Sequence, residues 1–317
     1  MNQKQYLAID IGGTSVKLGV VDETGAVLAK AEESVSFDGY ETPILTTVLK
    51  AAKTFVDGQG LSPASFVGVG VSATGQIDSR VGTVVGTCGN VPHYIGSPIK
   101  AELEALFGLP VTVANDANCM CLGEVWVGGA KGYTDVIGVT LGTGVGGGVI
   151  VNGKVVDGTH GAGGEIGHIT VNPHETAVCG CGKRGCLEQY SSATGVVRCM
   201  KKLLEENPEV DCVLRGKEFE AKDVFDAARS GDALAAREVE EMSNTLGMAL
   251  ANIASTTDPE MFLVGGGVAR AGDVLFDPLV KHFKEYAFRS CRETPIKSAS
   301  LGNDAGIYGA VRLIVGE

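Results

Sequence analysis

A short strand, a glycine-rich turn and a second strand occur twice in this chain, and this repeat constrains the fold more than any other feature. The first copy extends from Tyr6 to Val21 across the turn Gly12-Gly13-Thr14. An ungapped shift of 130 residues aligns Ala8–Thr14 with Gly138–Gly144, and Val16–Val21 with Gly146–Val151. Two such hairpins predict an internally duplicated α/β fold, with two domains around a central cleft.

Both turns have the chemistry of a phosphate site, because a glycine-rich turn exposes backbone N–H groups. The first turn follows a strand that ends in Asp10, whose carboxylate suits a magnesium ion. A plain hairpin with an incidental aspartate is the alternative. The second copy has Thr140 in place of Asp10, so we expect only the first half to bind the metal ion.

The segment Gly161–Glu188 predicts a second kind of metal site. Cys179, Cys181 and Cys186 lie within eight residues, and His168 lies upstream. Three thiolates and one imidazole are typical of a closed tetrahedral zinc site, which can fold a loop that has few apolar residues. The glycines between the cysteines, at positions 180, 182 and 185, allow the sulfurs to face one point.

Two alternatives apply to this segment. The cysteines could form one disulfide and leave a thiol over, although their close spacing is a poor disulfide geometry. His174 could replace His168 as the fourth ligand. Glu165 and Glu188 bracket the cluster and are not needed to complete it, so we expect both carboxylates to bind something else.

Composition excludes several classes of partner. The net charge of −12 without a basic block argues against nucleic acid and anionic membranes. With no secretory or membrane-spanning run, we expect a cytoplasmic protein whose nine cysteines are reduced or metal-bound. Glycine, at 46 residues, is about twice its usual share of roughly 7%, which indicates many tight turns. Cys119 and Cys121 are expected to be small buried hydrophobes.

The rest of the chain alternates helical and strand patterns. Apolar spacing predicts strands at 66–71, 110–114 and 261–264, and helices at 41–58, 99–107, 116–127, 191–206, 221–230, 232–255, from 268, and at 304–315. Loops after parallel strands bind ligands in open α/β sheets. Gly75 and Gln76, in the predicted loop Ser72–Asp78, and Asn90 are therefore candidate ligand contacts, with surface turns as the alternative. Gly265-Gly266-Gly267 follows a strand and could lie against a nucleotide.

Asp116 follows a predicted core strand and precedes a helix. An aspartate there is usually a helix cap. Beside Asn115, its carboxylate could instead accept a proton from a substrate hydroxyl.

Four motifs together resemble the ROK family (repressors, open reading frames and sugar kinases) over essentially the whole chain. They are Asp10-Ile-Gly-Gly-Thr14, Leu141-Gly-Thr-Gly-Val-Gly-Gly-Gly148, Gly164-Glu-Ile-Gly-His168 and Cys179-Gly-Cys-Gly-Lys-Arg-Gly-Cys186-Leu-Glu188. The resemblance implies an actin-like ATPase (ribonuclease H-like) fold of two α/β domains with a zinc-binding loop. We expect a small domain of residues 1–114 plus 304–317 and a large one of residues 115–303.

The resemblance also implies an activity. Kinases of this family transfer the γ-phosphoryl group of ATP, with Mg²⁺, to a hexose hydroxyl, usually at carbon 6. It makes Asp116 the catalytic base and implies sugar contacts from Asn115, Glu165, His168 and Glu188, which join the loop candidates Gly75 and Asn90. It implies ATP contacts from Gly12, Gly13, Thr14, Thr143, Gly144, Gly265, Gly266 and Gly267. We expect Asp10 and Lys17, which lie next to the first turn, to bind ATP as well. His168 would bind zinc with one ring nitrogen and face the sugar with the other, and a homodimer is expected.

The sugar itself is left open. Many glucokinases of the family have Asn-Leu-Pro-Gly-Trp where this chain has Asn90-Val-Pro-His-Tyr94. Glucose, an N-acetylhexosamine such as N-acetylmannosamine, and a β-glucoside are the candidate substrates. The family's repressors carry an N-terminal helix-turn-helix domain, which is not expected here. An actin- or chaperone-like ATPase and a zinc ribbon are further rivals, and neither explains all four motifs.

Overall fold

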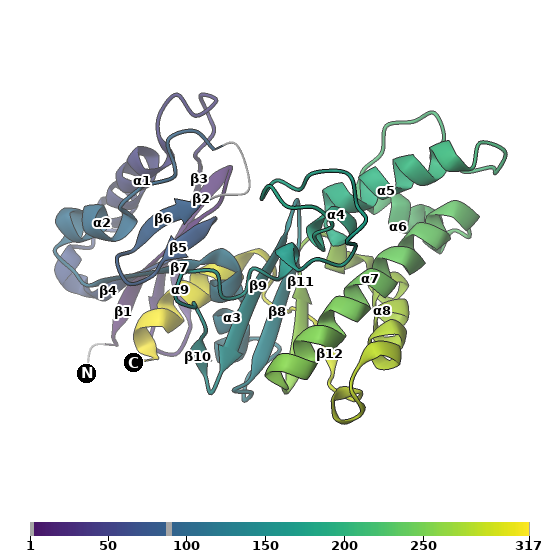
Figure 1. Cartoon of the computed structure of the whole chain (residues 1–317). Helices are drawn as coiled ribbons and strands as arrows, with labels where there is room; N and C mark the ends of the chain where they lie inside the picture. Colours follow the sequence, from purple (N-terminus) through teal and green to yellow (C-terminus); the bar gives the residue numbers. More distant parts are fainter. Residues whose placement is uncertain (1–2, 87–90, 317) are drawn as a thin grey trace. The chain divides into compact units, whose positions relative to one another are not determined.

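The computed structural model describes residues 3–86 and 91–316 (Figure 1). By its internal contacts the chain forms two compact units. The first comprises Met1–Gly132, Gly148–Gly164 and Leu301–Glu317, and the second comprises Tyr133–Gly147 and Glu165–Ser300. The domain boundaries that the sequence suggests, after residues 114 and 303, stay a prediction.

The first sheet has the strand order β3-β2-β1-β4-β7. Its strands are β1 Gln5–Ile11, β2 Ser15–Asp22, β3 Val27–Ser34, β4 Phe66–Ala73 and β7 Val111–Asn115. β1, β2 and β3 pair antiparallel, whereas β4 pairs parallel with both β1 and β7. The turn Gly12-Gly13-Thr14 therefore lies at the same edge of the sheet as the carboxyl ends of β4 and β7.

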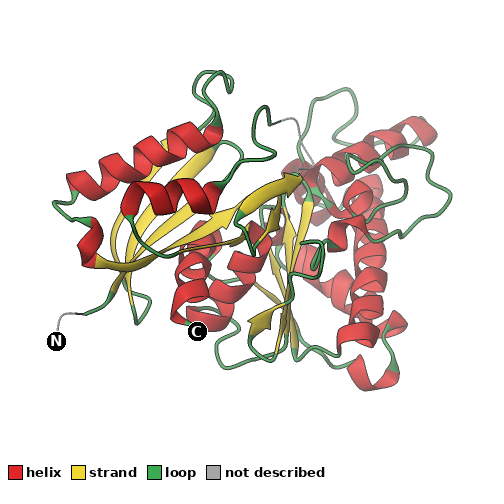
Figure 2. Ribbon diagram, turned by 60° about the vertical axis from the view of Figure 1, so that its left-hand side comes forward, coloured by secondary structure: helices red, strands yellow, loops and turns green. Residues whose placement is uncertain are grey.

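Strand β1 is apolar almost throughout because both faces of this sheet are covered. Leu7, Ile9 and Ile11 belong to a core that includes residues of α1 (Ile44–Gly58) and α2 (Ile99–Phe107). Tyr6 and Ala8 point to the other face, where they pack with α9 (Ala305–Val315). Figure 2 shows α1 and α2 on one side of these strands and α9 on the other. α9 packs so closely that a Cβ at Gly70 would overlap the Ala310 carbonyl group.

The second sheet repeats this arrangement, with the order β10-β9-β8-β11-β12. Its strands are β8 Val136–Leu141, β9 Val145–Val151, β10 Lys154–Val155, β11 Met261–Gly265 and β12 Ile296–Ser298. β10 pairs antiparallel with β9, and β11 pairs parallel with β8 and β12. Both sheets are thus an antiparallel three-stranded meander followed by two parallel strands, which confirms the predicted internal duplication.

The remaining helices are α3 beside the first sheet and five in the second unit. Their bounds are α3 Asp116–Val127, α4 Glu188–Ser191, α5 Ala193–Glu206, α6 Ala221–Arg229, α7 Ala233–Thr257 and α8 Asp273–Tyr286. Short 3₁₀ turns occur at Pro63–Ser65, Ile166–His168, Val268–Ala271, Arg289–Cys291 and Gly302–Asp304. Phe262 of β11 contacts Phe283 of α8 edge to face, with ring centroids 5.6 Å apart.

Three expectations need correction. The first helix begins at Ile44, because Pro43 is its N-cap residue and restricts the residue before it. Ser72–Asp78 is only partly a loop: β4 extends to Ala73, and Gln76–Asp78 forms β5, which pairs with β6 (Thr83–Gly86). No continuous helix begins at Val268, because Gly272 has a positive φ of 64° and α8 begins after it.

Two further observations complete the fold. Cys119 and Cys121 are fully buried on α3, as expected. Within residues 3–86 and 91–316, no helix is both long and apolar enough to cross a membrane.

Candidate functional site

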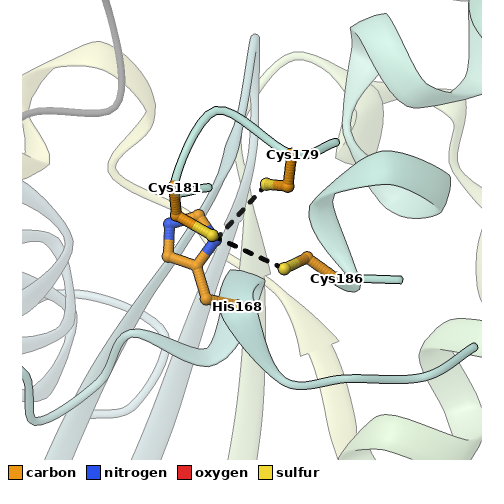
Figure 3. Close-up of side chains that lie close together, drawn as sticks. All are labelled: His168, Cys179, Cys181 and Cys186. Atoms are coloured by element: carbon orange, nitrogen blue, oxygen red, sulfur yellow. Dashed lines mark hydrogen bonds between the residues drawn. The ribbon is translucent and has the colours of Figure 1, made fainter. Parts of the chain in front are cut away.

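The predicted metal ligands come together in the second unit. Figure 3 shows His168, at the end of a 3₁₀ turn, with Cys179, Cys181 and Cys186 around it. Their ligand atoms all lie within 4.8 Å of one another.

The spacing of these atoms fits a metal ion better than a disulfide. Cys181 Sγ lies 3.6 Å from Cys186 Sγ, and Cys179 Sγ lies 3.8 Å from His168 Nδ1. A tetrahedral zinc with bonds of about 2.3 Å to sulfur has edges of about 3.8 Å, whereas a disulfide bond is about 2.05 Å long. None of the cysteines that the structure describes is in a disulfide. The His-Cys₃ set is therefore consistent with a zinc site.

The backbone of the loop explains why these residues converge. Gly182 and Gly185 have positive φ values of 85° and 70°, and a Cβ at Gly185 would overlap the Asn172 carbonyl group. Gly180 has no such requirement, so two of the three glycines are needed for the turn. His174, the alternative ligand, is exposed and lies outside the cluster.

The two carboxylates beside the cluster differ. Glu165 is partly exposed, and its Oε2 lies 3.9 Å from His168 Nε2, the ring nitrogen away from Cys179. Burial raises the pKa of Glu165 above its usual value. Glu188 Oε2 accepts a 3.0 Å hydrogen bond from Val145 N, and its Oε1 lies 3.7 Å from Cys179 Sγ. Neither carboxylate belongs to the metal cluster, and Glu188 binds an amide of the other predicted motif instead. The expected contacts of both carboxylates with a sugar stay a prediction.

The turn Gly142-Thr143-Gly144 joins β8 to β9, as the repeat predicts. Gly142 N donates to Gly144 O at 3.0 Å. In the matching turn of the first unit, Gly12 N donates to Ser15 O at 2.9 Å. Thr14 and Thr143 are exposed at the tips of the two turns.

The third glycine segment lies at the end of β11. Gly265 is buried as the last residue of the strand, whereas Gly266 and Gly267 are exposed. A Cβ at Gly266 would overlap the backbone of Leu141, at the end of the adjacent strand β8. The backbone here is thus open on one side and packed against β8 on the other.

Asp10 lies at the end of β1, next to the first turn. Its Oδ1 accepts a 2.7 Å hydrogen bond from Ser72 Oγ, and its Oδ2 lies 3.3 Å from Lys17 Nζ. Lys17 Nζ also donates to Asn303 O at 2.8 Å. Asp10 and Lys17 are paired across β1 and β2, which explains why two residues seven apart meet.

Asp116 lies in the same unit, at the first position of α3. Its Oδ1 accepts hydrogen bonds from Asn115 Nδ2 at 2.9 Å and Ala117 N at 2.8 Å. Asn115 Nδ2 also donates to Gly75 O at 2.8 Å, so three predicted sugar contacts lie together. Asn115 Oδ1 accepts from Ala117 N and Asn118 N and caps the helix. Asp116 is therefore not the cap, which leaves its carboxylate for another role.

The electrostatics of Asp116 suit a proton acceptor. Burial, reinforced by the negative charge of Asp10, raises the pKa of Asp116 to about 6, while hydrogen bonds from Ala117, Thr74 and Asn115 act in the opposite direction. A base with a pKa just below neutrality is ionised at pH 7 and still accepts a proton readily.

Some residues of this region escaped the sequence reasoning. Ser72 and Thr74, which bind Asp10 and Asp116, looked like ordinary residues of a predicted loop. The only signal was their place after a buried parallel strand. Asn90 lies outside the described residues.

The comparisons with known proteins agree with this arrangement. Residues 6–317 match the ROK family, and the chain belongs to this family as a glucokinase-like, ATP-dependent sugar kinase. It is 38% identical to a glucokinase of Halalkalibacterium halodurans over 99% of this chain and 96% of that protein. It is 31% identical to an N-acetyl-D-glucosamine kinase of Yersinia pseudotuberculosis over 98% of this chain and 99% of that protein.

A solved structure extends the likeness to the fold. The ROK glucokinase of Streptomyces griseus, crystallised with glucose and AMPPNP, superimposes with a TM-score of 0.77. It is 35% identical in sequence, and the match covers 98% of each chain. The actin-like fold implied by the four motifs is thereby confirmed.

Proposed function

We propose that this chain transfers the γ-phosphoryl group of ATP to a hexose, with glucose as the first candidate and its 6-hydroxyl as the acceptor. Asp116 is the general base. The observation that carries this role is its carboxylate, raised in pKa to about 6 and bound by Asn115 beside Gly75. The H. halodurans and S. griseus glucokinases support the choice of glucose.

The other residues divide by the groups they would bind. Asn90, Asn115, Glu165, His168 and Glu188, with Gly75, would hold sugar hydroxyls, since carboxylates, amides and imidazole match hydroxyl donors and acceptors. The amides of Gly12, Gly13, Thr14, Thr143 and Gly144 would bind phosphate, and Gly265–Gly267 would contact the adenosine. Lys17 would offset phosphate charge.

Two metal ions complete the proposal. Asp10 would hold Mg²⁺, which offsets charge on the transferred phosphoryl group. His168, Cys179, Cys181 and Cys186 would hold zinc, which stabilises the loop that ends in Glu188. His168 could face the sugar with Nε2, because Nδ1 is the nitrogen near Cys179.

In the proposed reaction Asp116 accepts the proton of the sugar hydroxyl as the hydroxyl oxygen attacks the γ-phosphorus, in line with the departing ADP oxygen. Asn115 keeps the carboxylate oriented through its side-chain amide, whose oxygen is fixed by the helix N-terminus. The sugar phosphate and ADP then leave, and Asp116 loses its proton to water.

The test is a panel assay. Purified protein with Mg²⁺-ATP is offered glucose, mannose, N-acetylglucosamine, N-acetylmannosamine, a β-glucoside or no sugar, and ADP release is followed. We expect glucose to give the largest kcat/KM and the sugar-free reaction to be slow. ADP release that no sugar accelerates would overturn the proposal in favour of a plain ATPase.

An N-acetylhexosamine is the second candidate substrate. The relative from Y. pseudotuberculosis supports it. Tyr94, which stands where many glucokinases of the family have Trp, makes glucose less certain without favouring one alternative. A kcat/KM for an N-acetylhexosamine above that for glucose would favour this assignment within the same mechanism.

Location and assembly remain proposals that rest on the family resemblance and on the reduced state that zinc thiolates require. We propose a cytoplasmic homodimer. Light scattering at micromolar concentration would reveal a mass of twice 32.7 kDa.

A further inference from the structure

The turn Gly142–Val145 is hydrogen-bonded to the segment Glu188–Thr194, which we term the brace. Three backbone groups of the turn bind it. Val145 N donates to Glu188 Oε2 at 3.0 Å, and Ala193 N donates to Gly142 O at 2.8 Å. Thr194 Oγ1 donates to Thr143 O at 2.8 Å. The brace thus binds the turn on both sides of its tip.

The brace has internal hydrogen bonds of its own. Ser192 is fully buried, and its Oγ donates to Glu188 O at 2.7 Å and accepts from Gly195 N at 2.9 Å, so it caps α5. The same oxygen lies 3.0 Å from Thr194 Oγ1. Both hydroxyl protons are donated to carbonyl groups, so the two oxygens are in contact without a further hydrogen bond between them. Ser192 thus binds Glu188, the residue that binds Val145 N, and contacts Thr194, the residue that binds Thr143 O.

The other end of the brace lies at the metal cluster. Glu188 follows the ligand Cys186 by two residues, and its Oε1 lies 3.7 Å from Cys179 Sγ. Its Oε2 lies so close to the turn that a Cβ at Gly144 would overlap it. A side chain at position 144 would therefore displace the Glu188 carboxylate from its contact with Val145 N.

These contacts leave a defined set of donors on the turn. Val145 N is taken by Glu188. Among the residues that the structure describes, the amides of Thr143 and Gly144 have no acceptor within the chain. Both residues are at least partly exposed, so these two amides can donate to an anion. The carbonyl groups of the same two peptide units, those of Gly142 and Thr143, are meanwhile bound by the brace.

We propose that the brace positions the turn for nucleotide phosphate, with Ser192 and Thr194 as positioning residues, so that the metal cluster and the phosphate turn form one assembly. The inference rests on the proposed function, since it assigns ATP phosphate to Thr143 and Gly144. Its specific content is that Thr194 acts on ATP through the Thr143 carbonyl group and does not act on the sugar.

The test compares Thr194→Val with Thr194→Ser. Valine keeps the shape and removes the donor, whereas serine restores it. Thr256→Val is the matched control: Thr256 is exposed on α7, and its hydroxyl donates to the carbonyl of Asn252 in its own helix at 3.0 Å. The measurements are the KM for ATP, the KM for sugar, kcat, and AMPPNP binding by calorimetry without sugar.

We expect Thr194→Val to raise the KM for ATP and the AMPPNP dissociation constant about two- to tenfold, the range for one net hydrogen bond. The KM for sugar should stay within about twofold, Thr194→Ser should restore ATP binding, and Thr256→Val should match the parent. An unchanged KM for ATP in Thr194→Val, or equal increases in both KM values, would overturn the inference.

Failure of the proposed function gives a different result. A parent protein that phosphorylates no sugar but binds AMPPNP would contradict the proposed reaction. Calorimetry would then still test whether the brace positions the turn. Weaker AMPPNP binding by Thr194→Val alone would support this role, and equal AMPPNP binding by Thr194→Val and Thr194→Ser would overturn it.

Discussion

Asp116 experiences opposing electrostatic influences. At the first position of α3, the helix dipole and the Ala117 amide favour its ionised form. Burial and the charge of Asp10 disfavour it and prevail, so its pKa rises to about 6. At pH 7 the carboxylate is then roughly nine-tenths ionised, and it is a stronger base than an ordinary aspartate.

This balance predicts the effect of mutation and of pH. Asp116→Asn should lower kcat by about 10²- to 10⁴-fold, the usual range for a general base, with a much smaller change in sugar affinity. Because the proposed base works only when ionised, kcat/KM of the parent enzyme should fall as pH decreases through about 6. Steady-state kinetics between pH 4.5 and 8.5 would check this, and a parent profile flat down to pH 4.5 would contradict the assignment.

At the residue scale, the sequence predicted the metal ligands but not the hydrogen bonds between side chains and distant backbone groups. His168 was the expected ligand because of its place in a motif, and the structure brings it to the cysteines. The hydrogen bond from Val145 N to the Glu188 carboxylate was not predictable. It joins residues 43 apart, and every residue except proline has such an amide, so no residue type indicates it.

At the scale of elements, the proposed zinc site predicts that the loop Val171–Cys186 depends on a metal ion for its stability. Between Val171 and Cys186 it has few buried residues, and hydrogen bonds such as those of Glu175 with Tyr190 and Arg198 supplement the four clustered ligands. Cys179→Ser should lower the zinc content from about one ion per chain, measured by plasma mass spectrometry, and lower the melting temperature. Because the brace begins beside the cluster, AMPPNP binding should weaken as well.

The control for this variant is Cys212→Ser, since Cys212 lies outside the cluster. It should keep the parent's zinc content and AMPPNP affinity. Full zinc content in Cys179→Ser would show that the cysteine is not a ligand.

The long helix α7 contains a buried carboxyl group that the proposed mechanism does not use. Glu238 is 2% exposed, and burial, with a smaller contribution from the charge of Glu241, raises its pKa from 4.5 to about 8. The folded protein therefore binds a proton that the unfolded chain releases between these pH values, so this group stabilises the fold at low pH and loses that contribution as pH rises through 8.

Glu238→Gln should remove this pH dependence. At pH 5 the variant and the parent should be similarly stable, because both side chains are neutral. At pH 9 the variant should be more stable by about 2 to 4 kcal/mol, since the parent must then bury a charge. Urea unfolding at both pH values measures the difference, with Glu205→Gln, an exposed site on α5, as the control. Equal differences at pH 5 and pH 9 would contradict the prediction.

At the scale of the whole molecule, sequence predicted the duplication because the two turns preserve the same order of strand, glycines and strand. In the structure, each predicted hairpin is part of the three-stranded meander of one sheet. The elements that sequence missed are short. β5, β6 and β12 have three or four residues each, too few for a period to be visible, and tertiary pairing decides their conformation.

The position of α9 has a consequence for biosynthesis. This helix covers the face of β1 and β4 that contains Tyr6 and Ala8, yet it is separated from them by almost three hundred residues. We therefore expect the nascent chain to expose the hydrophobic face of β1 and β4 until α9 has been translated. Chaperones that shelter such surfaces should associate with the growing polypeptide throughout that interval.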